Sequence, residues 1–322
     1  MYLFLAFLAL LTERLVGYPD WVYRAIGHPV TWIGRLISVL DNRWNREGDG
    51  FGNRRRWGIA ALMSILMLVI TIALLVQNLL LALPLGFILL IVASATLPAQ
   101  KSLERHVEAV ATALETSGLE AGRMAVSMIV GRDPDQLDEP AVCRAAIESL
   151  AENFSDGIVA PVFWLGVGGL AGGAAYKAVN TADSMIGHRS ARHEAFGWAA
   201  ARFDDLVNLP ASRLSGALFV IAATFVEGAS PRHAIDAIRR DAGHHRSPNA
   251  GWPEAAMAGA LGIALAGPRS YGGKTIKARF MGDGGRSNLD ATDIRRALKL
   301  ARVADGLLVG LLGLAALVIS QV

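Results

Sequence analysis

The chain has 322 residues, of which 53% are hydrophobic and 18% are charged. A soluble domain carries roughly 25% charged residues, so the composition excludes a disordered or fibrous chain and favours an integral membrane protein. The net charge of +3 is too small to suggest nucleic-acid binding. Cys143 is the only cysteine, which excludes an intrachain disulfide and a cysteine-based zinc site.

The clearest membrane signal is an uncharged segment between residues 57 and 100. One bilayer crossing needs ~20 residues, and this segment is about twice that length. Pro84 and Gly86 lie near its middle. The pattern therefore predicts two membrane-spanning helices, at about 57–77 and 79–99, joined by a tight turn.

Other apolar stretches predict further spans less clearly. Residues 1–17 and 304–322 read as two more spans, whereas 157–176, 214–230 and 255–268 remain undecided because they are Gly-rich or short. Short stretches can be re-entrant when protein covers their backbones.

Charge decides the side on which the polar segments lie. Three arginines precede the first predicted span, and the segment 177–213 is also basic. The positive-inside rule places both in the cytoplasm, and it opposes a crossing at 157–176. The basic residues are Arg54, Arg55, Arg56, Lys177, Arg189, Arg192, Arg202 and Arg213.

Soluble-looking helices are expected between the apolar stretches. Residues 101–126 and 138–154 place apolar side chains at helical spacing, with a turn at 131–135 between them. No convincing alternating strand pattern occurs. We therefore predict an all-α, polytopic integral membrane protein, forming one membrane domain over 1–322 with amphipathic cytoplasmic helices between the spans.

The first polar constellation contains Glu148, Glu152 and Asp156, with Asn153 beside them. Spacings of four place the three acids within one face of a helix, where like charges repel. A cation such as Mg²⁺ carrying a phosphate ligand would neutralise them. The alternative is a solvated acidic face.

Two further constellations follow. Asn180, Asp183 and Gly187 share a helix face, and Gly187 would let another group approach the backbone closely. An ordinary polar helix end is the alternative. Asp204 and Asp205, with Asn208 one turn later, resemble a Mg²⁺–phosphate ligand set, although Asp pairs are common on surfaces.

The fourth constellation begins with Asp241, His244 and His245 and continues to residue 254. A shared transition metal is one interpretation, but the segment is rich in turn residues. We favour a polar loop, at 244–254, that contacts a substrate.

These residues alone support two classes of function. One is a membrane enzyme that uses Mg²⁺ with a phosphorylated or nucleotide substrate. The other is a transporter whose buried acids would carry protons or cations and would lie inside spans. The spans predicted at 57–77 and 79–99 contain no acid, which favours the enzyme.

Taken together, the constellations resemble the CobD/CbiB family of cobalamin biosynthesis, the adenosylcobinamide-phosphate synthases. The resemblance covers about residues 13–273, and one position departs from it, because Tyr18 stands where the family usually has Asp. The strings that carry the resemblance are His28-Pro29-Val30, Glu148 to Asn153, Ser155-Asp156-Gly157, Tyr176-Lys177, Asn180-Thr181, Asp183-Ser184-Met185, Gly187-His188, Asp204-Asp205 with Asn208 and Pro210, Ser247 to Glu254, and Tyr271-Gly272-Gly273.

The resemblance implies an ATP-dependent ligase in the inner membrane. Such an enzyme joins aminopropanol, or its O-phosphate, to a propionate carboxylate of adenosylcobyric acid, with ATP and Mg²⁺ as cofactors. The bilayer, the corrinoid and the amine are the expected partners, with membrane-associated enzymes of the same pathway as possible further ones.

Roles follow as expectations from that resemblance. Carboxylates would hold Mg²⁺, His188 or His245 would accept the amine proton, and Lys177 would contact phosphate as a catalytic group. The expected metal ligands are Glu148, Glu152, Asp156, Asp204 and Asp205. The expected substrate- and phosphate-binding residues are Asn153, Asn180, Asp183, Asn208, Arg213, Asn249 and Trp252.

Overall fold

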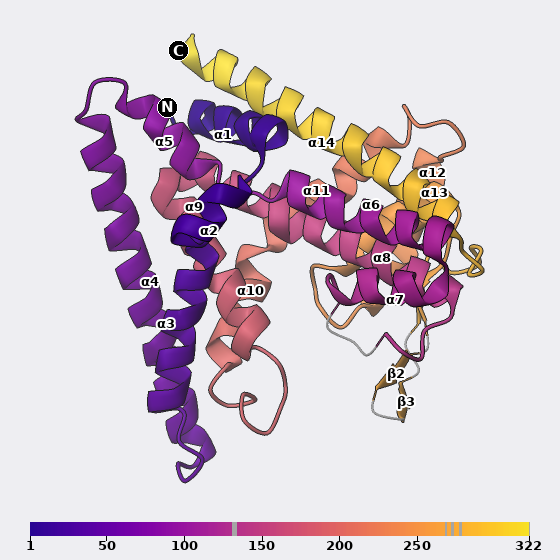
Figure 1. The fold of residues 1–322 in the computed structure, drawn as a ribbon, viewed down its shortest axis with the longest axis horizontal. Coiled ribbons are helices and arrows are strands. Elements are labelled where there is room, and N and C mark those ends of the chain that lie inside the picture. The colour runs from indigo at the N-terminus through magenta and orange to yellow at the C-terminus, as the bar shows by residue number, and fades with distance from the viewer. Residues whose placement is uncertain (131–133, 268, 272–273, 277–278, 322) are drawn as a thin grey trace. The chain divides into compact units, whose positions relative to one another are not determined.

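The computed structural model describes residues 1–130, 134–267, 269–271, 274–276 and 279–321 (Figure 1). The chain divides into two compact units. Unit 1 comprises Met1–Ala99, Ala160–Asn208 and Leu312–Val322, and unit 2 comprises Gln100–Val159 and Leu209–Leu311. Two sequence-based predictions extend beyond the described residues, since the turn at 131–135 includes 131–133 and the string Tyr271-Gly272-Gly273 includes 272–273.

Unit 1 is helical throughout its described part. Helices α3 and α4 run side by side, and α9 and α10 pack against α4 (Figure 1). The helices of this unit are α1 Tyr2–Val16, α2 Asp20–Ile26, α3 Pro29–Trp44, α4 Phe51–Leu81, α5 Gly86–Ser94, α9 Ala160–Ile186 and α10 Trp198–Val207, together with the end of α14 Ala291–Ser320.

Local signals explain where these helices begin and end. Nδ1 of His28 accepts the backbone N–H of Val30 at the start of α3, and Pro29 occupies the first turn, where its missing N–H costs nothing. Helices α1 and α2 end at Gly17 and Gly27, whose φ angles of 71° and 74° suit glycine.

Apolar side chains of several helices form the core of unit 1. Ile65 of α4, Ala182 of α9, Phe196 of the following loop and Ala200 of α10 are buried in one cluster. Gly58 brings α4 against that loop, because a Cβ there would lie 1.8 Å from the carbonyl oxygen of Phe196. The α9 and α10 segments are therefore held closely against α4.

Helix α9 is broken at Gly168 and Gly169, and Gly169 has a positive φ of 62°. The break frees the N–H of Leu170, which donates at 3.0 Å to Oε1 of Gln77 on α4. Gln77 is only 4% exposed, so its amide satisfies a backbone group away from water. A glycine-rich stretch that the sequence alone leaves undecided is thus a kinked helix with a side-chain partner.

The predicted pair of helices at 57–77 and 79–99 needs a correction. Helix α4 covers the first and extends to Leu81, but α5 has only 9 residues. The chain turns at Leu85, which has a φ of 61°, and a Cβ on Gly86 would lie 1.6 Å from the Leu80 carbonyl oxygen. At 1.5 Å per residue, α5 is too short to cross a bilayer by itself.

Unit 2 combines helices with two small antiparallel sheets, in which β1 pairs with β4 and β2 with β3. These strands of two or three residues were not predicted, because they are too short to produce an alternating pattern. The elements are α6 Gln100–Ser117, α7 Leu119–Ser127, α8 Glu139–Asn153, the π-helix η1 Phe154–Val159, α11 Leu209–Ala222, α12 Pro231–Asp241, the 3₁₀ helix η2 Ala242–His244, α13 Gly251–Leu261, β1 Leu265–Ala266, β2 Arg269–Tyr271, β3 Lys274–Ile276, β4 Phe280–Met281 and most of α14.

The centre of unit 2 is apolar, and one of its edges is a row of ion pairs. Phe154 and Phe219 are buried with their ring centroids 4.7 Å apart. Arg295 of α14 pairs with Glu115 of α6 at 2.5 Å, and Arg302 pairs with Glu104 at 2.7 Å. These pairs align the first half of α14 with α6.

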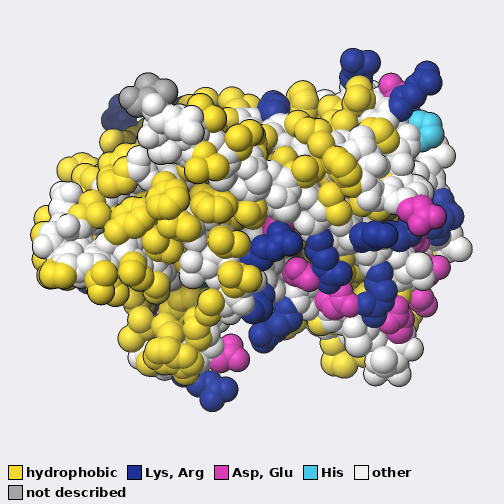
Figure 2. Space-filling view, turned by 90° about the horizontal axis from the view of Figure 1, so that it is seen from above, with side chains coloured by type: hydrophobic (Ala, Val, Ile, Leu, Met, Phe, Trp, Pro, Cys, Tyr) yellow, Lys and Arg dark blue, Asp and Glu magenta, His cyan; other side chains and the backbone are white. Residues whose placement is uncertain are grey.

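Three described helical segments are long and apolar enough to cross a membrane, namely Phe51–Leu81, Glu139–Ile186 and Ala291–Ser320. The pair Tyr2–Val16 and Asp20–Trp44, bent by 105°, would add a fourth if it forms one broken span. The segment 157–176, which the charge argument kept out of the membrane, lies inside the second of these. Figure 2 shows hydrophobic side chains gathered over one part of the visible face and charged ones over another.

Candidate functional site

Unit 1 brings the second and third polar constellations together. The hydroxyl of Tyr176 on α9 donates a 2.8 Å hydrogen bond to Oδ1 of Asn208, which follows α10. The amide of Asn208 in turn donates to Oδ2 of Asp204 at 2.9 Å. Asn208 is fully buried and Tyr176 is 2% exposed. A tyrosine and an amide therefore fix one oxygen of a buried carboxylate.

The other oxygen of Asp204 has a different environment. Among the described residues, Oδ1 of Asp204 is buried and accepts no hydrogen bond. Burial and the nearby carboxylate of Asp183 raise the pKa of Asp204 to about 7, while the amides of Asn208 and Asn180 act in the opposite direction. A buried acceptor without a partner is costly, and such a group calls for a ligand or a proton.

The carboxylates of Asp183 and Asp205 act electrostatically on Asp204, and other charged side chains lie on the same two helices or just after α9. Asp183 lies within electrostatic reach of Asp205 and His188, and Lys177 lies close to the imidazole of His28. We use the name α9–α10 cluster for Tyr176, Lys177, Asn180, Asp183, His188, Asp204, Asp205 and Asn208.

Gly187 confirms the close approach expected from its position. A Cβ at Gly187 would lie 1.9 Å from Oδ1 of Asp183 and 2.7 Å from the Asp183 carbonyl oxygen. The group that approaches is thus the Asp183 carboxylate of the preceding turn. Any side chain at position 187 would displace that carboxylate.

Asp204 and Asp205 are the residues of the α9–α10 cluster that could hold a magnesium ion. The described residues contain no group of three or more His, Cys, Asp or Glu side chains arranged around one point. Mg²⁺ commonly binds one or two protein carboxylates and takes its remaining ligands from phosphate and water. Asp204 and Asp205 supply such carboxylates, and the unpartnered oxygen of Asp204 fits a cation.

Unit 2 holds a second group of predicted substrate-binding residues. Nη1 of Arg213 donates to Oδ1 of Asn249 at 2.8 Å and to Oγ of Ser212 at 2.9 Å. Its guanidinium lies 4.8 Å from the ring centroid of Trp252. Arg213 is half-buried, so a preoriented cation on an aromatic face is available to bind an anion.

The structure distinguishes the two histidines proposed as proton acceptors. Nδ1 of His245 accepts the backbone N–H of Ser247 at 3.0 Å, and Nε2 lies 3.7 Å from the buried carboxylate of Glu254. Both ring nitrogens of His245 therefore face protein groups. His188 is exposed and lies beside the Asp183 carboxylate, so it is the better placed of the two.

The acids of the first constellation do not share one environment. Glu148 is 4% exposed, and its Oε1 accepts the backbone N–H of Ala266 at 2.7 Å. Glu152 is exposed, whereas Asp156 lies in the π-helical turn η1, which alters the regular spacing. Asn153 donates to the backbone of Ser149. The three acids thus do not form one shared face: Glu148 contacts the backbone of Ala266, and Glu152 lies at the surface.

The fourth constellation is also divided. Asp241 is buried, and its Oδ2 accepts the backbone N–H groups of Gly282 and Asp283 at 2.8 and 3.1 Å. It also pairs with Arg240. Burial opposes ionisation, but these hydrogen bonds lower the pKa of Asp241. This carboxylate holds a turn, and among the described residues it forms no metal group with the histidines.

The sequence-based site predictions gave no role to the residues that support the site. Tyr176 precedes Asn180 by one helical turn, and this spacing was the available signal for its place in the cluster. Ser212 and Glu254 are ordinary polar residues until the fold places them beside Asn249 and His245. Tyr18, at the departing position, donates its hydroxyl to the carbonyl of Gly27 at 2.7 Å and packs against His28.

Comparison with known proteins identifies the family. The family model described as CobD/Cbib protein matches residues 6–301. The chain is 53% identical over 292 residues to the cobalamin biosynthesis protein CobD of Sinorhizobium fredii, covering 90% of this chain and 89% of that protein. It is 51% identical to the CobD of Rhizobium meliloti over 90% of each chain.

A more distant relative extends the match along the chain. The CobD of Rhodobacter capsulatus is 47% identical over 311 residues, covering 96% of this chain and 95% of that protein. No solved structure matches the chain. The family match and these identities over nine-tenths or more of the chain lead to one conclusion: the chain belongs to the CobD/CbiB family.

Proposed function

We propose that this protein acts in cobalamin biosynthesis as an ATP-dependent amide ligase. It would join aminopropanol or aminopropanol O-phosphate to a propionate carboxylate of adenosylcobyric acid and release adenosylcobinamide or its phosphate. Membership in the CobD/CbiB family and the names of its relatives support the pathway. The α9–α10 cluster, with the buried and partly unpartnered Asp204, is the observation that carries the chemistry.

The reaction needs an activated carboxylate. A carboxylate is a poor acyl donor to an amine, because its leaving group would be an oxide. Transfer of the γ-phosphoryl group of ATP to a carboxylate oxygen gives an acyl phosphate and ADP. The amine nitrogen then attacks the acyl carbon, the C–O bond to phosphate breaks, and phosphate leaves as the amide forms. The protein must position the reactants and balance their charge.

The α9–α10 cluster can supply both. Asp204 and Asp205 would hold Mg²⁺, which balances phosphate charge when it is bound. Asn180 and Asn208 carry amides that orient oxygens, and Lys177 is a cation for the transferred phosphoryl group. His188 would take the proton that the attacking amine loses.

In unit 2, the Arg213–Asn249–Trp252 group would bind an anionic or planar part of a substrate. Arg213 keeps donors beyond those used for Asn249 and Ser212, because a guanidinium carries five N–H groups. Trp252 adds an aromatic face beside it. The corrin ring and a phosphate are the two substrate parts with matching chemistry.

We propose that the cluster faces the cytoplasm, where ATP is available, and that the protein is a multi-pass protein of the inner membrane. Arg54, near the start of α4, donates to the carbonyl groups of Ala191 and Arg192 in the segment that joins α9 to α10. The arginine-rich start of α4 and this segment therefore lie on the same side of any membrane that α4 crosses. The positive-inside rule favours the cytoplasm for both.

A transporter or carrier for a corrinoid or a cation is the second candidate. Lys177, Asn180 and Asp183 lie on Glu139–Ile186, a segment apolar enough to span a membrane. Ionisable residues within spans are typical of ion pathways. The position of Asp183 on this segment therefore favours a transporter more than the sequence analysis did.

The Asp205→Asn variant tests the proposal. We expect it to abolish ATP-dependent amide formation while the protein still inserts into the membrane and folds, because the substitution preserves volume and removes one charge. A fully active variant would remove Asp205 from the site. A reporter fused near residue 195 should read cytoplasmic, and a periplasmic reading would refute the orientation.

A further inference from the structure

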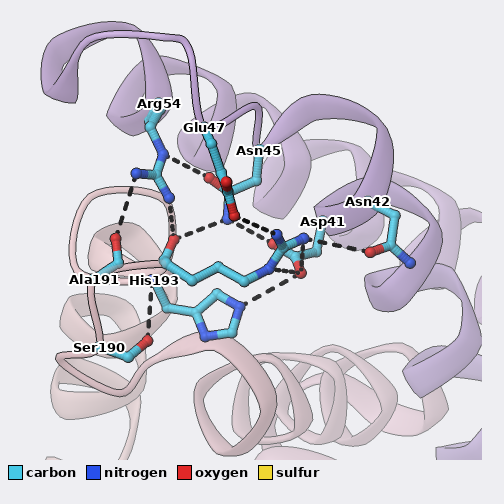
Figure 3. A network of polar contacts seen from close by, with 9 residues as sticks. Asp41, Asn42, Asn45, Glu47, Arg54, Ser190, Ala191 and His193 are labelled. Carbon is cyan, nitrogen blue, oxygen red and sulfur yellow. Dashed lines mark hydrogen bonds and ion pairs between the residues drawn. The ribbon is translucent and has the colours of Figure 1, made fainter.

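A buried polar network outside the α9–α10 cluster joins α3 and α4 to the segment between α9 and α10 (Figure 3). Asp41, near the end of α3, is 8% exposed. Its Oδ2 accepts from Nε and Nη2 of Arg192 at 3.1 and 3.0 Å and lies 3.4 Å from Nε2 of His193. Its Oδ1 accepts the amide of Asn45 at 2.7 Å.

The same network also binds the main chain at Ala191 and Arg192. The amide of Asn45 donates to the Arg192 carbonyl at 2.9 Å, and Arg54 donates to the carbonyls of Arg192 and Ala191. Nε of Arg54 donates to Oδ1 of Asn45 at 2.8 Å, which links the two side chains. Residues of α3 and α4 thus hold both a side chain and two carbonyl groups of one loop.

That loop, residues 187–197, joins the two helices that carry the α9–α10 cluster. It begins beside Asp183, carries His188 and leads into the helix of Asp204. Its far end is equally tight, because a Cβ at Gly197 would lie 1.6 Å from the carbonyl oxygen of Ile186. The loop therefore has little freedom to change the distance between α9 and α10.

We propose that Asp41 is a positioning residue of the candidate site, which acts through Arg192, Asn45 and the 187–197 loop to set the spacing of α9 and α10. Asp41 is charged and buried, and both of its carboxylate oxygens are paired. Its partners described above are Arg192 and His193 of the loop and Asn45, which itself donates to the loop backbone. As far as turnover is concerned, the inference rests on the proposed ligase function.

The chain offers a matched control. Glu47 faces the same Arg192 at 3.9 Å, but its side chain is 86% exposed. Glu47→Gln removes one negative charge beside Arg192 without removing a buried contact, whereas Asp41→Asn removes the charge that the network surrounds. Arg192→Gln removes the other member of the Asp41–Arg192 ion pair, which is the more exposed one. It replaces Asp41→Asn in the test if that variant fails to fold.

Spin labels on the two helices test the spacing directly. Ser184 and Phe203 are exposed on α9 and α10, and Cys143 is fully buried, so Cys143→Ala with Ser184→Cys and Phe203→Cys allows a distance measurement in the full-length protein. We expect one narrow distance distribution in this background and with Glu47→Gln. We expect a broader or shifted distribution with Asp41→Asn and with Arg192→Gln.

Kinetics separates positioning from mere tethering. In the otherwise unchanged protein, Asp41→Asn should lower kcat about 10- to 100-fold, since small misplacements of reacting groups have effects of that order, while KM for ATP changes less than about threefold. An unchanged distance distribution in both Asp41→Asn and Arg192→Gln would overturn the proposal. A broadened distribution with normal kcat would overturn the catalytic part and leave a structural tether. A wild-type protein that forms no amide would refute the ligase, while the distances would still decide whether Asp41 sets the spacing.

Discussion

Tyr176 and Asp204 are joined through the side chain of Asn208, which accepts from the tyrosine hydroxyl and donates to the carboxylate. The arrangement fixes the amide orientation, because its oxygen faces a hydroxyl donor and its nitrogen faces an acceptor. One oxygen of Asp204 is thereby held in place, and the other is left for a ligand or a proton. The chain Tyr176–Asn208–Asp204 thus joins α9 to α10 by two buried hydrogen bonds.

Tyr176→Phe tests whether this chain orients Asp204. The substitution removes the hydroxyl that donates to the Asn208 oxygen, and loss of such a buried hydrogen bond costs about 1–3 kcal/mol of unfolding free energy. We expect kcat to fall about tenfold, a change of about 1.4 kcal/mol in activation free energy. Steady-state kinetics and thermal unfolding in detergent measure the two effects. Unchanged kcat together with lowered stability would limit Tyr176 to a structural role.

The titration of Asp204 predicts a pH dependence of stability in magnesium-free buffer. An unfolded aspartate has a pKa of about 3.9, whereas burial raises the pKa of Asp204 to about 7 in the folded protein. Between these values the native state binds a proton that the unfolded chain lacks. The stabilisation from this group is therefore complete below about pH 4 and is lost as the pH rises through about 7.

We accordingly expect the Tm of the wild-type protein to fall between about pH 5 and pH 8 when magnesium is chelated. Asp204→Asn should flatten that part of the profile, because the amide does not titrate. Added Mg²⁺ should raise the wild-type Tm most at the higher pH, where the carboxylate is free to bind it, and should have less effect on the variant. Identical profiles for both proteins would show that Asp204 does not titrate in this range.

The two candidate histidines should respond differently to substitution. His188→Ala should lower kcat, because it removes the group proposed to accept the amine proton. His245→Ala should mainly lower the Tm, since it removes the acceptor for the Ser247 N–H and the partner of Glu254. Reversed effects, with a lowered kcat only in His245→Ala, would move the proton acceptor to unit 2.

Gln77→Leu tests the partner of the break in α9. Loss of the amide leaves the N–H of Leu170 without the acceptor that holds it at 3.0 Å. An orphaned buried donor costs about 1–3 kcal/mol, so we expect a lower Tm in detergent. Gln77→Glu keeps an acceptor at that position and serves as the control. Equal Tm values for Gln77→Leu and the wild-type protein would mean that the break does not depend on Gln77.

Much of the helical organisation was predictable, because uncharged runs and helical spacing are local properties of the sequence. The α4 helix and the apolar C-terminal helix agree with those patterns. The short α5 was not predictable, since Leu85 adopts a left-handed conformation that few non-glycine residues take. The tiny strands in 265–281 have too few residues to show an alternating pattern.

The candidate site was predictable only in part, for the same reason. The sequence placed Asn180 and Asp183 on one face, and it placed Asn208 one turn after Asp204. It contained no signal that Asp41 meets Arg192, because 151 residues separate them and each is an ordinary charged residue alone. Long-range pairing of this kind follows from packing of α3, α4 and α9, which no local pattern specifies.

The most direct test of the central claim is a ligation assay on the purified wild-type protein. It would contain Mg²⁺-ATP and adenosylcobyric acid, with aminopropanol in one reaction and its O-phosphate in another. The ligase predicts a corrinoid amide that forms with one of the amines, in a one-to-one ratio to ADP. Tight corrinoid binding with no ADP and no amide for either amine would contradict it, and the α9–α10 cluster would then be an ion or carrier site.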